Sequence, residues 1–199
     1  MRPSIIIAAF AWLSLGGCTL LECAVKPDDS GPEGDADTDA DTDTDTDTEF
    51  CDEVLPDRPP GGPDCLSGSL SCGASVTATT EGGSDHFDAE HYENFFCLVP
   101  EGEYLGSERV YEIELAGDVL ATFDLYSPCA DLDVIVLRQD DIGSCPDSDQ
   151  LLTECEADVS TGSGSTTVWT DRPSRYLVIV DGKRGVEDNF ELQVGCESR

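Results

Sequence analysis

The sequence predicts an all-β fold, an antiparallel sandwich or barrel, between residues 50 and 199. Short segments in this part of the chain alternate apolar and polar residues with a period of two. Turn-forming Gly, Pro, Asp and Ser separate these segments. Most of the cysteines also lie here, as expected of a fold that disulfides staple together. No helix is expected after residue 49.

Five segments are the predicted strands. Apolar and polar side chains alternate in VYEIEL (110–115), TFDLY (122–126) and NFELQV (189–194), so each segment has one apolar face. LDVIVL (132–137) and YLVIV (176–180) are apolar on both faces, which is typical of central strands covered on both sides.

The N-terminus, residues 1–17, is predicted to be an export signal. Arg2 precedes the apolar run Ile5–Leu15, which is too short to span a bilayer and suits the core of a signal peptide. Leu15-Gly16-Gly17-Cys18 resembles the lipobox of bacterial lipoproteins, which implies acylation of Cys18 and anchoring to the cell envelope. The expected location is the outer membrane or the cell surface, and the inner membrane is the alternative. Cys23 fits less well because Glu22 precedes it. A soluble secreted protein and an uncleaved anchor are the alternatives.

Residues 18–49 are predicted to form a disordered acidic tether. An EF-hand loop is excluded because every Asp from 35 to 47 has an odd number. The turn glycine and the bidentate glutamate of such a loop would therefore fall on even-numbered positions, where neither residue stands. The Asp/Thr-rich tract has no hydrophobic residue larger than alanine, so it cannot bury enough surface to offset its ordering entropy.

The formal net charge of −33 limits the possible partners. Nucleic acid and anionic lipid headgroups are excluded, because binding them requires patches of Lys and Arg. Cationic partners, divalent metals and neutral glycans remain open.

Cysteine usage agrees with an oxidising compartment. If Cys18 carries lipid and Cys23 belongs to the tether, an even number remains for disulfides. A zinc cluster is disfavoured because the chain has no CxxC pair and only 2 histidines. The cysteines expected in four disulfides are Cys51, Cys65, Cys72, Cys97, Cys129, Cys145, Cys155 and Cys196.

From about residue 70 to residue 196 the chain resembles the bacterial pre-peptidase C-terminal domain. The resemblance depends on Asp131-Leu132-Asp133 before a buried strand, on the Tyr176–Gly182 strand and on the final hairpin at Phe190–Val194. It implies an antiparallel, jelly-roll-like β-sandwich, and it also implies a disulfide between Cys145 and Cys155. Members of this family usually accompany secreted hydrolases, whereas no enzyme domain is evident in this sequence.

No catalytic residue is predicted, and the chain is expected not to be an enzyme. The GxSxG, Walker and GxGxxG motifs are absent. His86, Glu90 and His91 superficially resemble a zinc-protease motif. Three residues separate Glu90 from the preceding histidine instead of two, so polar loop residues are the preferred interpretation.

Acidic residues at the predicted strand ends are candidate calcium ligands, because hard cations prefer several oxygen ligands at loop ends. Solvated turn acids are the preferred alternative in such an acidic chain. Trp169 and Tyr176 are candidates for a glycan or protein contact, and ordinary surface or core residues are the preferred alternative. The calcium candidates are Asp131, Asp133, Asp140, Asp141, Asp181 and Asp188, with Glu187 beside the last of them.

The sequence therefore favours a non-enzymatic β-sandwich module that a lipid and an acidic tether display on the cell envelope. Its expected partner is an extracellular protein or glycan. The alternatives are an accessory subunit of a secreted hydrolase and an enzyme of unrecognised type.

Overall fold

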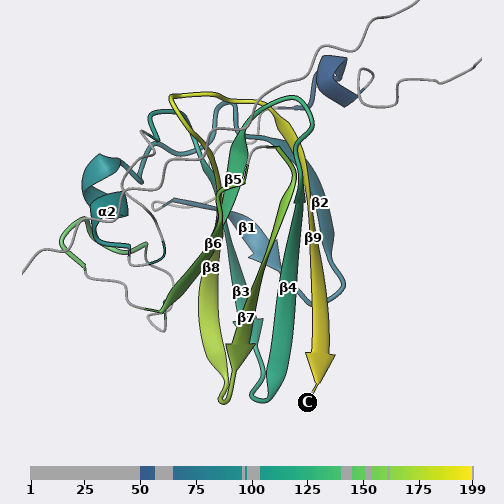
Figure 1. Ribbon diagram of the computed structural model, residues 1–199, viewed down its shortest axis with the longest axis vertical. Helices are drawn as coiled ribbons and strands as arrows, with labels where there is room; N and C mark the ends of the chain where they lie inside the picture. The colour runs from purple at the N-terminus through teal and green to yellow at the C-terminus, as the bar shows by residue number, and fades with distance from the viewer. Residues whose placement is uncertain are drawn as a thin grey trace, which may run out of the picture. The chain divides into compact units, whose positions relative to one another are not determined.

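The computed structural model describes residues 50–56, 65–95, 97, 104–139, 145–150, 154–160 and 162–198 (Figure 1). The predicted signal peptide, the acylation site Cys18 and the acidic tether lie outside these residues and stay predictions. Within the described ranges, no helix has the length and apolar character needed to cross a bilayer.

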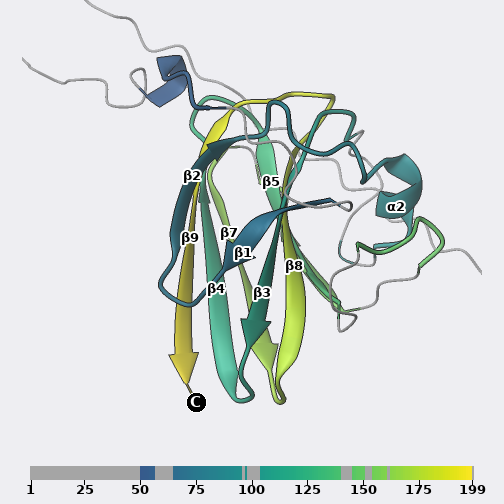
Figure 2. The same cartoon turned by 180° about the vertical axis from the view of Figure 1, so that it is seen from behind.

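Two β-sheets pack face to face (Figures 1 and 2). The five-stranded sheet has, in spatial order, β1 (Leu66–Leu70), β3 (Arg109–Leu115), β8 (Ser174–Gly182), β5 (Leu132–Arg138) and β6 (Cys155–Asp158). The four-stranded sheet has, in spatial order, β2 (Ser75–Thr79), β9 (Asn189–Ser198), β4 (Val119–Tyr126) and β7 (Gly164–Thr170). The predicted all-β sandwich is confirmed.

Strand pairing is antiparallel between all of these neighbours except β1 and β3, which run parallel. The predicted strands correspond to β3, β4, β5, β8 and β9, whereas β1, β2, β6 and β7 were not predicted. Their sequences, LSGSL, SVTAT, CEAD and GSTTVWT, are rich in small or polar residues and lack the strong alternation of the other strands.

Apolar side chains fill two separate cores, which explains why β5 and β8 are apolar on both faces. Phe123, Val134 and Val178 belong to the core between the sheets. Ile135 and Ile179 belong to a second cluster on the outer face of the five-stranded sheet. Aromatic residues of the segment around α2 (Ala89–Glu93) cover this second cluster.

Helix α2 contradicts the expectation that no helix follows residue 49, as does a helical turn at residues 50–52. The Asp88 side chain caps α2 by accepting hydrogen bonds from the backbone N–H groups of Glu90 and His91. Asn94 ends the helix, and its Nδ2 donates to the carbonyl of Glu90 at 3.1 Å. Five residues are too few to display a helical period, so the sequence pattern missed α2.

Eight cysteines form four disulfides, as predicted, but the implied Cys145–Cys155 bridge is wrong. The bridges are Cys51–Cys129, Cys65–Cys145, Cys72–Cys196 and Cys97–Cys155. Four of these cysteines, Cys65, Cys97, Cys145 and Cys155, lie at the second core. Cys155 begins the edge strand β6 and packs there near the chain that follows α2, so Cys97 is its partner. Cys145 instead meets the residue that precedes β1.

Candidate functional site

A cluster of acids and tyrosines lies buried beside α2, on the outer face of the five-stranded sheet. Asp133 on β5 and Asp181 on β8 are directly opposite each other in the antiparallel pair, and both are fully buried. The hydroxyl of Tyr92 donates a hydrogen bond to Asp181, and the hydroxyl of Tyr104 donates one to Asp133.

Lys183 supplies the positive charge of this cluster. Its Nζ lies 3.2 Å from the Asp133 carboxylate and 4.0 Å from Oδ2 of Asp131. Lys183 Nζ also donates to the carbonyl of Val159 at 2.8 Å. The ammonium group therefore pairs with two of the candidate calcium ligands, Asp131 and Asp133.

Glu108 is a third fully buried acid. Its Oε1 accepts hydrogen bonds from the hydroxyl of Ser84 and from the backbone N–H of His86, the latter at 3.0 Å. Its Oε2 has no hydrogen-bond partner among the described residues. Burial raises the pKa of Glu108, and the hydrogen bonds that its carboxylate accepts oppose this rise.

Burial shifts the acids of the cluster toward their neutral forms. It raises the pKa of Asp181 to about 8 and raises the pKa of Asp133 and of Glu108 above their ordinary values. Burial also raises the pKa of the Tyr92 hydroxyl, and the nearby Asp181 charge raises it further. The tyrosines therefore act as hydrogen-bond donors here, and the cluster serves to join α2 and the following loop to the sheet.

Among the described residues, the candidate calcium ligands do not come together as a metal site. Asp131 and Asp133 face Lys183, and the Asp181 carboxylate accepts from Tyr92. The Asp188 carboxylate is used locally, since it accepts from the backbone N–H of Asn189 at 2.7 Å. Asp140 and Asp141 lie outside the described residues. No group of three or more His, Cys, Asp or Glu side chains within the described ranges could hold a metal ion.

The histidine-containing segment is only partly the loop that the sequence suggested, because Glu90 and His91 belong to α2. The two imidazole rings of His86 and His91 lie 4.8 Å apart. Nε2 of His86 donates to the carbonyl of Pro146 at 3.0 Å, and Nδ1 of His91 lies 2.8 Å from Asp88. Both rings thus make structural contacts around the helix.

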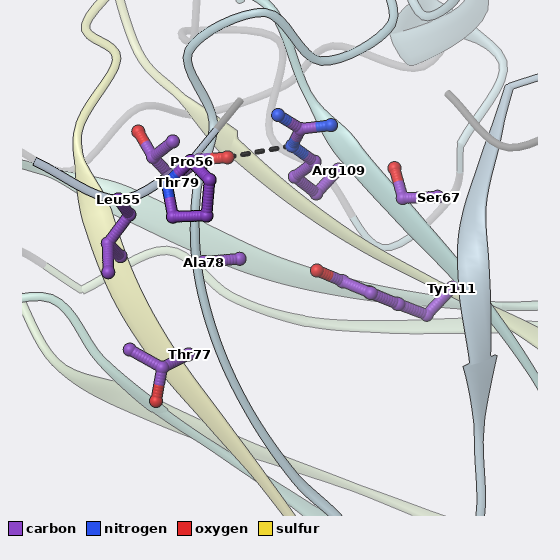
Figure 3. Close-up of a pocket in the computed structure, with 8 residues that line it drawn as sticks. All are labelled: Leu55, Pro56, Ser67, Thr77, Ala78, Thr79, Arg109 and Tyr111. Atoms are coloured by element: carbon purple, nitrogen blue, oxygen red, sulfur yellow. Dashed lines mark hydrogen bonds between the residues drawn. The ribbon is translucent and has the colours of Figure 1, made fainter. Parts of the chain in front are cut away.

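A small pocket lies between the edge strands β1 and β2 (Figure 3). Its volume is about 180 Å³, and Leu55 and Pro56 form part of its wall. Nε of Arg109 donates to the carbonyl of Thr79 at 2.7 Å, as the dashed line in Figure 3 shows. Asn189 Nδ2 holds the 50–56 segment in place through two backbone carbonyls. The polar groups of this pocket are therefore committed to the fold.

Two more open grooves are present: one lies at the edge strands β6 and β7, and the other lies at the ends of β3, β5 and β8. The tryptophan groove, of about 270 Å³, is lined by Glu154, Cys155, Glu156, Val168, Trp169 and Tyr176. The arginine groove, of about 590 Å³, is lined by residues 114–116, 138 and 172–175. An ion pair between Arg138 and Glu154 joins the two grooves.

The arginine groove is largely neutralised by its own neighbours. Arg175 contacts Oε2 of Glu112 through both Nε and Nη2, each at 3.0 Å, and Arg138 pairs with Glu154. The tryptophan groove differs because Trp169 remains 56 % exposed. It is therefore the better candidate for binding a ligand. Sequence reasoning had named Trp169 and Tyr176 but missed Glu154 and Glu156, because β6 was not predicted.

No protein-family model matches the chain, and no curated protein matches it. One similar solved structure is the pre-peptidase C-terminal domain of collagenase from Bacillus anthracis. It matches at 10% identity and a TM-score of 0.37, and the alignment covers 71% of this chain and 99% of that domain. PliG of Aeromonas hydrophila, a periplasmic inhibitor of g-type lysozyme, matches at 12% identity and a TM-score of 0.37, covering 67% of this chain and 99% of PliG.

A third similar structure is CorA of Methylomicrobium album BG8, a surface-associated copper-binding protein. It matches at 8% identity and a TM-score of 0.38, and the alignment covers 66% of this chain and 98% of CorA. These similarities concern the β-sandwich arrangement, and no function is transferred from them. The chain is a disulfide-stapled β-sandwich.

Proposed function

We propose that this chain is an exported lipoprotein that displays a non-enzymatic binding module on the cell envelope. In this proposal Cys18 carries the lipid, residues 18–49 act as an acidic tether, and the sandwich binds its ligand through the tryptophan groove. The observation that carries the binding role is the 56 % exposure of Trp169 in a groove on a rigid scaffold.

Disulfides and charge support this role. Four disulfides suit a protein that folds and persists outside a reducing cytosol. They hold both edges of the sandwich, so the groove is preorganised and loses little entropy when a ligand binds. The large negative charge keeps such a displayed domain soluble.

The anchor is tested by the incorporation of a labelled fatty acid in a bacterial host that acylates lipoproteins. Wild-type protein should be labelled and should partition into detergent. Cys18→Ala should abolish the label, whereas the matched control Cys23→Ala should retain it. Labelling that survives Cys18→Ala, or that disappears only with Cys23→Ala, would refute the assignment of Cys18.

The binding role is tested with the oxidised chain from residue 19 onward, exported behind a cleavable signal. This soluble protein should sediment with isolated cell-envelope material. Trp169→Ala should reduce sedimentation strongly, because it removes the exposed ring of the groove. Leu105→Ala, which removes an apolar side chain that is 65 % exposed elsewhere, is the control and should have no effect. Equal sedimentation of the two variants would contradict a binding role for the groove.

A further inference from the structure

Trp169 is well suited to present an aromatic face to a ligand. It lies on the edge strand β7, where alternate side chains point into the core and toward solvent. Its neighbour Val168 is buried, whereas the Trp169 side chain is 56 % exposed. Within the described ranges, the indole N–H has no hydrogen-bond partner. Because the other tryptophan of the chain, Trp12, belongs to the predicted signal peptide, Trp169 is the only one expected after its removal.

Two carboxylates, those of Glu154 and Glu156, line the same groove as Trp169. Cys155 and Ala157 of β6 pack against the second core, so the alternate residues Glu154 and Glu156 point to the other side, where the tryptophan groove lies. Oε2 of Glu154 accepts a hydrogen bond from Nη1 of Arg138. Neither the other oxygen of Glu154 nor either oxygen of Glu156 has a partner among the described residues.

A groove lined by an exposed indole and two carboxylates, of which only Glu154 is paired within the described residues, is complementary to an organic cation. A cation placed over a tryptophan ring is attracted by the negative potential of its face. A guanidinium group can stack on the ring and donate to a carboxylate at the same time, which favours Arg over simple inorganic ions. A groove of about 270 Å³ has room for such a side chain.

The charge of the whole chain selects the same class of partner. A net charge of −33 attracts positively charged segments and repels acidic ones, which raises the association rate of basic partners at low salt. A neutral glycan would gain nothing from this field. The groove and the long-range electrostatics therefore favour the same ligand.

We propose that the tryptophan groove captures an arginine or lysine side chain from a basic segment of an extracellular protein. The cation stacks on Trp169 and pairs with Glu154 and Glu156. This inference rests on the proposed binding function and names the class of its partner.

The fluorescence of Trp169 gives a direct test, because it is the only tryptophan in the chain from residue 19 onward. The oxidised chain is titrated with an acetylated, amidated Gly-Arg-Gly-Arg-Gly peptide. The matched peptide with citrulline in place of Arg has nearly the same shape and no charge. Saturable quenching by the Arg peptide, weaker at higher salt and absent with citrulline, is the expected result. Equal effects of the two peptides would overturn the proposal.

Variants separate the groove from the acidic background. Glu156→Gln should weaken binding about threefold, and the double change with Glu154→Gln should weaken it about tenfold. Glu53→Gln removes an exposed carboxylate near β2, at the other edge of the sandwich, and should leave binding unchanged. If Glu53→Gln weakens binding as much as Glu156→Gln does, the peptide is held by diffuse charge and the groove assignment is wrong.

A third probe distinguishes an error in the proposed cationic partner from an error in the proposed binding function. A neutral hexasaccharide of N-acetylglucosamine is titrated in the same way. Quenching by the sugar but not by the Arg peptide would overturn the cationic partner and leave a binding groove in place. If the soluble chain also fails to sediment with envelope material, the binding function itself is contradicted.

Discussion

Replacing Asp181 with Asn should abolish most of the loss of stability that the wild-type protein shows between about pH 5 and pH 7. Asp181 is fully buried on β8, and burial raises its pKa to about 8. In the unfolded chain the same group ionises near pH 4. Between these two values the folded state therefore binds one proton more than the unfolded state, so stability is greatest at low pH and decreases as the pH rises.

The magnitude follows from proton linkage. A difference of one bound proton changes the free energy of unfolding by about 1.4 kcal/mol per pH unit. Ionisation of Asp181 alone should thus lower the free energy of unfolding by about 2 to 3 kcal/mol between about pH 5 and pH 7. For a domain of this size, this corresponds to a decrease of roughly 5 to 10 °C in melting temperature. Asp133 and Glu108, whose pKa values burial also raises, add to the loss. The lowered pKa of Asp88 acts only below about pH 4, where it opposes the trend.

The assay is urea unfolding of the oxidised chain at three pH values, with two-state behaviour checked by two probes. Asp181→Asn keeps acceptor and size, so Tyr92 can still donate to it, but the side chain cannot ionise. Its stability should vary with pH by at least 2 kcal/mol less than that of the wild type over the same range. Asp171→Asn, at an exposed turn, controls for the loss of one surface charge. A wild-type stability that increases from pH 5 to pH 7, or an Asp181→Asn variant with an unchanged slope, would refute the linkage argument.

Three further outcomes are expected. Non-reducing peptide mapping should find Cys145 joined to Cys65 and not to Cys155; a Cys145–Cys155 peptide would contradict the described pairing. Lys183→Met should lower the free energy of unfolding by about 3 to 5 kcal/mol in urea titrations, because it leaves a buried carboxylate without its ion-pair partner. Asp88→Ala should cost about 1 kcal/mol and speed hydrogen exchange at the α2 amides, since these lose their cap; unchanged exchange would show that the cap is not needed.

Strong local patterns were predictable from the sequence. The alternation in VYEIEL and NFELQV identified β3 and β9, and the apolar segments LDVIVL and YLVIV identified the central strands β5 and β8. The edge strands β6 and β7 were missed because edge strands bury one face incompletely and carry small or charged residues. For β1, the parallel pairing with β3 joins residues far apart in the chain, which no local pattern records.

The disulfide pairing and the lining of the candidate site could not be predicted, because both depend on contacts that form only in the folded chain. Cys145 and Cys155 are close in sequence, but their partners are set by a second core on the outer face of the sheet, which only the fold reveals. Trp169 could be named as a candidate from the sequence alone, because of its residue type. Its carboxylate neighbours Glu154 and Glu156 could not, because they reach it from a strand in the other sheet.

The placement of the cations explains why the groove retains its negative charge. Arg109 donates to backbone carbonyls, Arg175 contacts Glu112, and Lys183 lies against buried Asp133. These positive charges serve the fold and so neutralise little of the exposed acidic surface. At the tryptophan groove, Arg138 engages only one oxygen of Glu154, and Glu156 stays uncompensated among the described residues. Because the cations stabilise the sandwich in this way, the Glu156 carboxylate remains unpaired among the described residues in the groove that Trp169 lines, as the proposed cationic ligand requires.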